Sequence, residues 1–198
     1  MIAIFDYGAG NLRSVENTLA EIGCEYKLVR NTEGLRAAEK VLLPGVGHFG
    51  QIMAALDELG VREALVERIR GGVPFLGICL GLQALFEASE EAPEARGLGI
   101  FPGTVRRFPV DARVPHMGWN DLERRGESKL LRGLPARPFV YFAHSYYVPE
   151  DARASALCHY EIPYTAALES GNIFGVQFHP EKSGPIGLQI VRNFIENS

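Results

Sequence analysis

A cysteine between two glycines is the strongest candidate for a nucleophile in this chain. In the run Gly77-Ile78-Cys79-Leu80-Gly81, each glycine lies two residues from the cysteine. This spacing is typical of a nucleophile elbow, a sharp turn that leads from a strand into a helix. The turn strains the backbone of the nucleophile, and side chains on the flanking residues would collide with the neighbouring strand and helix. The pattern therefore predicts that Cys79 is presented for chemistry.

The residues on both sides of this cysteine support the same interpretation. Residues 73–78 are apolar and uncharged, which is typical of a strand buried on both faces of a parallel sheet. The residues that follow, through Glu87, are predicted to form a helix. A helix N-terminus offers unpaired N–H groups and partial positive charge, and both stabilise a thiolate. The alternative is a small buried thiol without chemistry, as free cysteines usually are.

A histidine and a glutamate near the end of the chain can complete a triad. A cysteine nucleophile needs a base, and the base needs an acceptor that orients it. His179 and Glu181 are two residues apart at the end of a predicted strand, a spacing that turns both side chains to one side. The carboxyl ends of parallel strands gather at one edge, where Cys79 also lies. Alone, this pair is better explained as a turn with a surface salt bridge, but with the elbow it predicts a triad.

Backbone N–H groups near the cysteine are candidates for an oxyanion hole. The N–H of Leu80 directly follows the nucleophile. A second donor can come from the loop that contains Gly45, Val46 and Gly47, because its glycines permit unusual backbone conformations. No metal site is expected, because the other histidines are scattered without ligand spacing. These histidines are His48, His116, His144 and His159.

Composition limits the class of protein. The 198 residues are 46% hydrophobic and 22% charged, which suits one globular domain over residues 1–198. The formal net charge of −4 argues against a nucleic-acid-binding surface. No apolar stretch approaches the ~18 residues of a membrane span, and the N-terminus lacks a signal-peptide pattern. The three cysteines lie far apart, so no disulfide framework is expected and a reducing cytoplasm fits best.

Strands and helices are predicted to alternate through about residue 88. This alternation predicts an α/β fold with a doubly wound, mostly parallel central sheet and helices on both faces. Recurring prolines and short segments between residues 89 and 138 predict an antiparallel extension of the sheet. Further strands are expected near residues 139–142, 155–159, 164–169 and 173–178, and a terminal helix begins at Pro185. The glycine-rich turn at residues 6–11 lacks the spacing of a nucleotide-binding fingerprint.

The motifs together resemble a known family. The runs at residues 77–83 (Gly-Ile-Cys-Leu-Gly-Leu-Gln) and 175–181 (Gly-Val-Gln-Phe-His-Pro-Glu) are similar to those of class I, triad-type glutamine amidotransferases. Four further stretches, at residues 6–11, 44–49, 116–120 and 144–146, resemble one branch of that family. This branch comprises the glutaminase subunits of imidazole glycerol phosphate synthase, in histidine biosynthesis. The resemblance implies the flavodoxin-like fold of class I glutamine amidotransferases.

The resemblance also implies roles and partners. Cys79 would attack the side-chain amide of glutamine, His179 would transfer protons and Glu181 would orient His179, without a cofactor. The ammonia would pass to a cyclase subunit, a (β/α)8 barrel, in a heterodimer. Glutamine would be held by Gln83, Ser145 and Tyr146. The surface that meets the cyclase would include Asn11, Trp119, Tyr141 and Lys182.

Other interpretations stay open at this level. Another class I glutaminase subunit, such as the pyridoxal phosphate type, is disfavoured by the Pro-Gly-Val-Gly and Gly-Trp-Asn motifs. A cysteine hydrolase or chaperone of the related protease-like superfamily would not be expected to carry the His-x-Glu ending. A non-catalytic interaction subunit is disfavoured by the intact triad. Trp119 is either a core residue or an interface anchor, and we expect it to be exposed in the isolated chain.

Overall fold

A mixed eight-stranded sheet is the centre of the molecule. The computed structural model describes residues 1–8 and 12–198, so the predicted interface residue Asn11 lies outside the described residues. The sheet has the order β2-β1-β3-β4-β13-β12-β11-β8. The parallel strands are β2 (Tyr26–Val29), β1 (Ile2–Phe5), β3 (Lys40–Gly45), β4 (Phe75–Cys79) and β13 (Ile173–Val176). The antiparallel strands are β12 (Ile162–Ser170), β11 (Ala154–Tyr160) and β8 (Glu123–Arg124).

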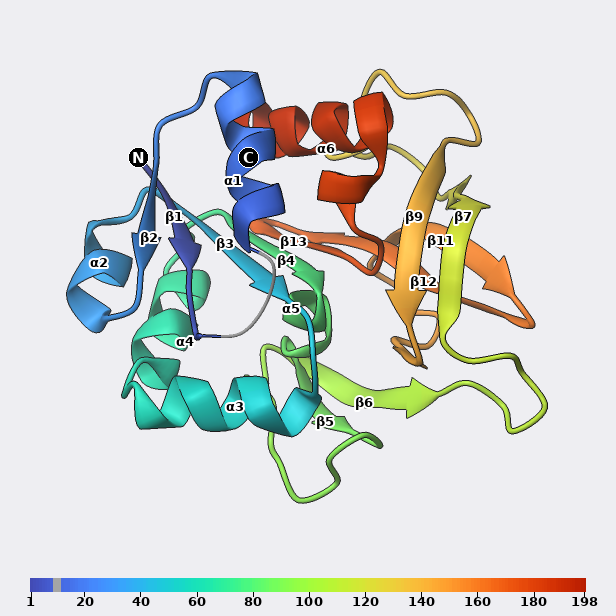
Figure 1. The fold of residues 1–198 in the computed structure, drawn as a ribbon, viewed down its shortest axis with the longest axis horizontal. Coiled ribbons are helices and arrows are strands. Elements are labelled where there is room, and N and C mark those ends of the chain that lie inside the picture. The colour runs from blue at the N-terminus through green and yellow to red at the C-terminus, as the bar shows by residue number, and fades with distance from the viewer. Residues whose placement is uncertain (9–11) are drawn as a thin grey trace.

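Helices cover both faces of the parallel half. They are α1 (Leu12–Ile22), α2 (Thr32–Ala37), α3 (Phe49–Glu58), α4 (Arg62–Arg70), α5 (Leu80–Gln83) and α6 (Gly184–Asn197). Helices α1 and α6 lie on one side of the sheet, and α3 and α4 lie on the other (Figure 1). Successive residues of the buried strands alternate between the two cores: Ala3 packs with α3 and α4, whereas Ile4 packs with α1 and α6. The strand order and the two helical layers confirm the predicted flavodoxin-like α/β fold.

Two small sheets extend the molecule beyond the parallel half. One has the order β10-β6-β5, from Tyr146–Tyr147, Phe101–Arg107 and Phe86–Ser89, and the other pairs β7 (His116–Asp121) with β9 (Phe139–His144). The predicted helix through Glu87 was wrong in its second half, because α5 ends at Gln83 and β5 begins at Phe86. The carbonyls of Ala84 and Leu85 accept hydrogen bonds from backbone N–H groups of residues 98–101, so they cannot continue a helix.

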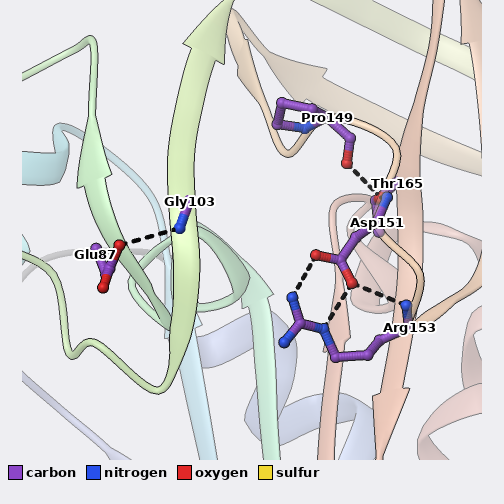
Figure 2. A network of polar contacts seen from close by, with 6 residues as sticks. All are labelled: Glu87, Gly103, Pro149, Asp151, Arg153 and Thr165. Carbon is purple, nitrogen blue, oxygen red and sulfur yellow. Dashed lines mark hydrogen bonds and ion pairs between the residues drawn. The ribbon is translucent and has the colours of Figure 1, made fainter.

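A charged network fixes the loop that precedes β11. The backbone N–H of Arg153 donates to the Asp151 carboxylate at 2.8 Å and its Nε donates at 2.6 Å. Thr165 of β12 donates to the Pro149 carbonyl at 2.7 Å and accepts from the Asp151 N–H at 3.1 Å (Figure 2). The guanidinium of Arg153 lies 4.2 Å from the ring centre of Phe101, which attaches the loop to β6.

No helix among the described residues is long and apolar enough to cross a membrane.

Candidate active site

The predicted elbow is present at the end of β4. Cys79 has φ +53° and ψ −105°, a conformation that L residues rarely adopt. A Cβ added to Gly77 would lie 2.4 Å from the carbonyl oxygen of Gly81. A Cβ added to Gly81 would lie 2.0 Å from the carbonyl oxygen of Leu43, on the neighbouring strand. Both flanking glycines are therefore required by close backbone approaches, and the cysteine carries the strain of the turn.

Strand β13 brings the histidine to the cysteine. It runs parallel to β4 with Val176 opposite Ile78, so the chain beyond Val176 passes beside Cys79. His179 Nδ1 lies 2.8 Å from the Glu181 carboxylate, and the two side chains are only 3% and 7% exposed. The predicted strand spacing of this pair was wrong, because β13 ends at Val176 and Glu181 lies in the 3-10 helix η1 (Pro180–Lys182). Pro180 begins that turn and directs the carboxylate back to the imidazole.

The surroundings of the imidazole favour its charged form. Burial alone would lower the pKa of His179, but hydrogen bonds to Cys79 and Glu181 outweigh burial and raise its pKa to about 10. The protonated imidazole then lies between the Cys79 sulfur and the Glu181 carboxylate. This arrangement suits a thiolate nucleophile that is paired with a proton donor for a leaving group.

A pocket of about 90 Å³ lies in front of the sulfur. Most of the predicted residues contribute to its wall, but Gly45 and Glu181 do not. The predicted residues that line it are Val46, Gly47, Cys79, Leu80, Gln83, Ser145, Tyr146 and His179. Three lining residues were not predicted: Glu91, Ala143 and His144. The Glu91 carboxylate accepts the Phe49 N–H at 2.7 Å, at the start of α3, which holds a negative charge at the pocket wall.

Two glycines, one at the end of β3 and one in the loop after it, have different purposes. A Cβ on Gly45 would lie 2.6 Å from both the Gly81 nitrogen and the Leu80 Cβ, so Gly45 permits close packing against the elbow. Gly47 has φ +102° and supplies the unusual backbone conformation. Between them, the N–H of Val46 donates to the Tyr7 hydroxyl at 3.2 Å, and that hydroxyl lies 3.2 Å from the Val46 carbonyl. Tyr7 therefore holds both the N–H and the carbonyl of Val46, and burial raises the pKa of its phenol to about 12.

Gln83 lines the pocket and also holds two of its neighbours. Its Nε2 donates to the Tyr146 carbonyl at 2.8 Å and to Gln177 Oε1 at 3.1 Å. Gln177 in turn donates through Nε2 to the Cys79 sulfur at 3.5 Å. No role was predicted for Gln177, although it lies in the same run as His179, because nothing in that run shows which atom its side chain contacts.

Three of the predicted interface residues lie close together: Trp119 on β7, Tyr141 on β9 and Lys182 in η1. Trp119 is 57% exposed, which confirms the expected exposure, and its ring lies 6.1 Å from that of Tyr141 at an angle of 77°. Lys182 Nζ lies 5.7 Å from the Tyr141 ring centre. Met117 and Phe139 are exposed on the same two strands. Apart from residues 9–11, no group of three or more His, Cys, Asp or Glu residues is arranged to bind a metal ion.

The fold and this pocket define a class of protein. A model of the family "Glutamine amidotransferase class-I" matches residues 3–197, and this chain belongs to that family. A solved glutamine amidotransferase superposes with a TM-score of 0.77 at 22% identity, over 98% of this chain and 97% of the other. PurLQS from Thermotoga maritima superposes with a TM-score of 0.76 at 18% identity, over 98% and 96%. These structural similarities bear on the fold alone.

Closer relatives share one name. The imidazole glycerol phosphate synthase subunit HisH of Methanothermobacter thermautotrophicus is 50% identical over 99% of this chain and 98% of its own length. The subunit of the same name from Desulfitobacterium hafniense (strain Y51) is 46% identical over 98% of this chain and 93% of its own length.

Proposed function

We propose that this chain is the glutaminase subunit of an imidazole glycerol phosphate synthase in histidine biosynthesis. It hydrolyses glutamine and supplies ammonia to a cyclase subunit, which forms imidazole glycerol phosphate and an aminoimidazole carboxamide ribotide. The observation that carries the proposal is the strained Cys79 beside the buried His179–Glu181 pair, at one pocket. The shared name of the close relatives supports the choice within the family. We also infer that residues 1–198 form one domain, because the family match spans residues 3–197.

The first half-reaction breaks the amide of glutamine. The thiolate of Cys79 attacks the side-chain carbonyl carbon, a C–S bond forms and the carbonyl oxygen becomes an oxyanion. Backbone N–H groups of Leu80 and of the loop at residues 45–47 are the proposed donors to that oxygen. His179 gives its proton to the amide nitrogen, the C–N bond breaks and ammonia leaves. Glu181 keeps the imidazole oriented throughout.

The second half-reaction releases glutamate. His179, now neutral, takes a proton from water, and the hydroxide attacks the γ-glutamyl thioester. The C–S bond breaks, glutamate leaves and the thiolate–imidazolium pair is restored. Gln83, Ser145 and Tyr146 are the proposed glutamine contacts. Glu91, whose carboxylate lines the pocket, suits the α-ammonium group of an amino acid.

The cyclase partner is proposed to be a (β/α)8 barrel that forms a heterodimer with this chain in the cytoplasm. Its proposed contact surface includes Asn11, Trp119, Tyr141 and Lys182. The last three lie close together on β7, β9 and η1, and they combine an aromatic anchor, the exposed Trp119, with a cation. Exposed aromatic side chains with a neighbouring charge are typical centres of protein interfaces.

We further propose that the partner switches the glutaminase on. The Val46 N–H donates to the Tyr7 hydroxyl, so it is engaged away from a developing oxyanion. The loss of one oxyanion donor typically costs about 10² to 10³ in rate. A partner that releases the Val46 N–H from Tyr7 would restore the donor and accelerate glutamine hydrolysis. The isolated chain is therefore expected to be nearly inactive.

The test compares glutamate release by three samples: the chain alone, the complex with a cyclase subunit, and the complex with the cyclase's nucleotide ligand. We expect a rise of at least 10²-fold from the first sample to the third. Cys79→Ala should abolish glutamate release while synthesis from added ammonia persists. Quenching or a shift of Trp119 fluorescence should report the complex, because Trp119 is the only tryptophan.

Two results would contradict the proposal. Glutamate release by Cys79→Ala at the wild-type rate would show that Cys79 is not the nucleophile. Full activity of the isolated chain would show that the partner does not activate the glutaminase. Tyr7→Phe tests the hold on Val46 directly and should raise the rate of the isolated chain. Tyr26→Phe is the matched control, because the Tyr26 hydroxyl contacts Glu16 at 3.3 Å and not the oxyanion loop.

A further inference from the structure

Gln177 occupies a position from which it can act on the nucleophile. It directly follows β13, where Val176 lies opposite Ile78 on β4, so Gln177 lies beside Cys79. Its side chain is completely buried, and both ends of its amide have partners. Nε2 lies 3.5 Å from the Cys79 sulfur, and Oε1 accepts from Gln83 at 3.1 Å. The residue therefore contacts the atom that reacts.

The orientation of the Gln177 amide is fixed by its neighbours. The Tyr146 carbonyl can only accept a hydrogen bond, so the Gln83 atom 2.8 Å from it must be the amide nitrogen. The same nitrogen faces Gln177 at 3.1 Å, so the Gln177 atom there must be its oxygen. The Gln177 nitrogen is therefore the amide atom that faces the Cys79 sulfur. An inverted amide would place two nitrogens against each other and an oxygen against Cys79.

A second line of hydrogen bonds reaches the same carbonyl from the other side. His144 Nδ1 lies 2.8 Å from the Tyr146 carbonyl and must carry its proton there. His144 Nε2 then accepts from the Tyr164 hydroxyl at 3.1 Å, and the Tyr164 oxygen accepts from His116 Nδ1 at 3.1 Å. The buried polar chain, as we name His116, Tyr164, His144, Tyr146, Gln83 and Gln177, thus ends on the cysteine sulfur.

A donor at this place has a defined chemical consequence. A hydrogen bond to the charged form of a group favours that form, so an amide N–H stabilises a thiolate more than a thiol. The donor also restricts where the sulfur can move, which matters for attack on a carbonyl carbon. His179 follows two residues later, so one segment supplies both a donor and a base to the nucleophile.

We propose that Gln177 is a further residue of the glutaminase reaction, whose amide N–H group holds and stabilises the Cys79 thiolate for attack. The inference rests on the proposed function, because it assigns a role within the same site. Gln83 contributes indirectly, as the group that keeps the nitrogen of Gln177, and not its oxygen, toward the sulfur.

The test uses Gln177→Met and Gln177→Glu in the complex with the cyclase subunit. Gln177→Met removes the donor at similar volume, and kcat for glutamate release should fall about 10- to 100-fold. The KM for glutamine should change less than about threefold, because the sulfur interaction is not a ground-state contact of the substrate. Gln177→Glu keeps the acceptor for Gln83 but places a carboxylate oxygen on the sulfur, so its loss should be larger.

A readout independent of turnover is the alkylation of Cys79 by iodoacetamide, followed by peptide mass spectrometry between pH 5 and 10. Only the thiolate reacts, so the pH midpoint of the rate reports how well the thiolate is stabilised. The midpoint should rise in both variants, by about one unit or more in Gln177→Glu. Thr165→Val is the matched control, because Thr165 is also fully buried with two hydrogen bonds but does not contact the site. It should leave the midpoint unchanged.

An unchanged kcat and midpoint in a folded Gln177→Met would overturn the proposal. If neither variant folds, NMR can compare the glutamine side-chain ¹⁵N–H signals of wild type with those of Cys79→Ala. The pair of signals assigned to Gln177 should shift when the sulfur is removed. An unshifted pair would contradict the contact between Gln177 and Cys79. The wild-type complex separates this inference from the proposed function. If the wild-type complex releases no glutamate, the proposed function is refuted. If the wild-type complex releases glutamate and the Gln177 variants release it equally fast, only the proposed role of Gln177 is refuted.

Discussion

Two polar networks in this molecule differ in charge, burial and consequence. The network of Asp151 and Arg153 is an ion pair near the surface, with the side chains 14% and 29% exposed. The buried polar chain consists of neutral groups, and Tyr164 and Gln177 within it are fully buried. The ion pair fixes a loop against β6, whereas the buried polar chain leads from His116, on the buried face of β7, to the cysteine sulfur.

The difference follows from the cost of desolvation. A partly exposed ion pair keeps some hydration and contributes little, whereas a buried polar group without a partner costs about 1–3 kcal/mol. A neutral buried network is therefore tolerated only when each donor meets an acceptor. That requirement fixes the tautomer of His144 and the orientation of the Gln177 amide. The buried polar chain therefore determines which atom faces the cysteine sulfur, whereas the ion pair contributes only to stability.

The largest stability effect is expected from Tyr164→Phe. The Tyr164 hydroxyl lies 3.1 Å from both His116 Nδ1 and His144 Nε2, so its removal leaves two buried ring nitrogens without this partner. We expect the free energy of unfolding to fall by about 2–4 kcal/mol in urea titrations. Tyr26→Phe removes a longer, more exposed contact and should lower the free energy of unfolding much less. Equal effects of the two substitutions would contradict a larger contribution of the buried polar chain to stability.

The second-largest effect on stability is expected from acid, through the two histidines of the buried polar chain. Burial lowers the pKa of His144 to about 3 and that of His116 to about 4. The unfolded histidines titrate near ~6.5, so the unfolded state binds more protons below that pH and stability falls as pH decreases. Two groups give a slope of up to about 2.7 kcal/mol per pH unit near pH 5.

His179 does not cancel this slope. Its folded pKa is raised to about 10, so its contribution to stability is complete below ~6.5 and is lost only as pH rises toward 10. Urea midpoints of wild type at pH 7, 6 and 5 should decrease steadily. His116→Gln with His144→Gln should flatten the decrease. A wild-type midpoint that stays constant from pH 7 to 5 would show that these histidines are not held neutral.

The smallest effect is expected in the ion pair. Hydrogen bonds from Arg153 hold the pKa of Asp151 below its usual value, so Asp151→Asn should cost about 1 kcal/mol at pH 7. The carboxylate contributes stability above its unfolded pKa and loses it as pH falls, so variant and wild type should converge below about pH 4. Glutamate release should not change. A loss of activity comparable to that of Gln177→Met would contradict the separation of the two networks.

The parallel half of the fold was predictable from sequence, because strands such as β1 and β3 are continuous apolar runs between clear turn signals. The residues after Gln83 were predicted incorrectly, because their apolar pattern fits a helix and only the approach of residues 98–101 ends it. The helix α2 was not predicted, although Asn31 caps it by accepting from the Gly34 N–H.

The candidate site was only partly predictable. Cys79 was predictable because the sharp turn requires glycines two residues before and two residues after it, and this spacing is visible in the sequence. The contacts of Tyr7 with Val46 and of Gln177 with Cys79 join residues 39 and 98 positions apart, so no local spacing indicates them. Their chemistry depends on which atom faces which, and that is decided by the assembled network.

Covalent labelling by a diazo-ketone analogue of glutamine, with the site mapped by mass spectrometry, tests most directly whether Cys79 is the nucleophile. Cys79 should be the one labelled residue, and glutamine should protect it. Burial raises the pKa of the Cys158 thiol to about 12 and also raises that of Cys24, so neither competes as a thiolate. Labelling of Cys24 or Cys158 with Cys79 unmodified would contradict the assignment of Cys79 as the nucleophile.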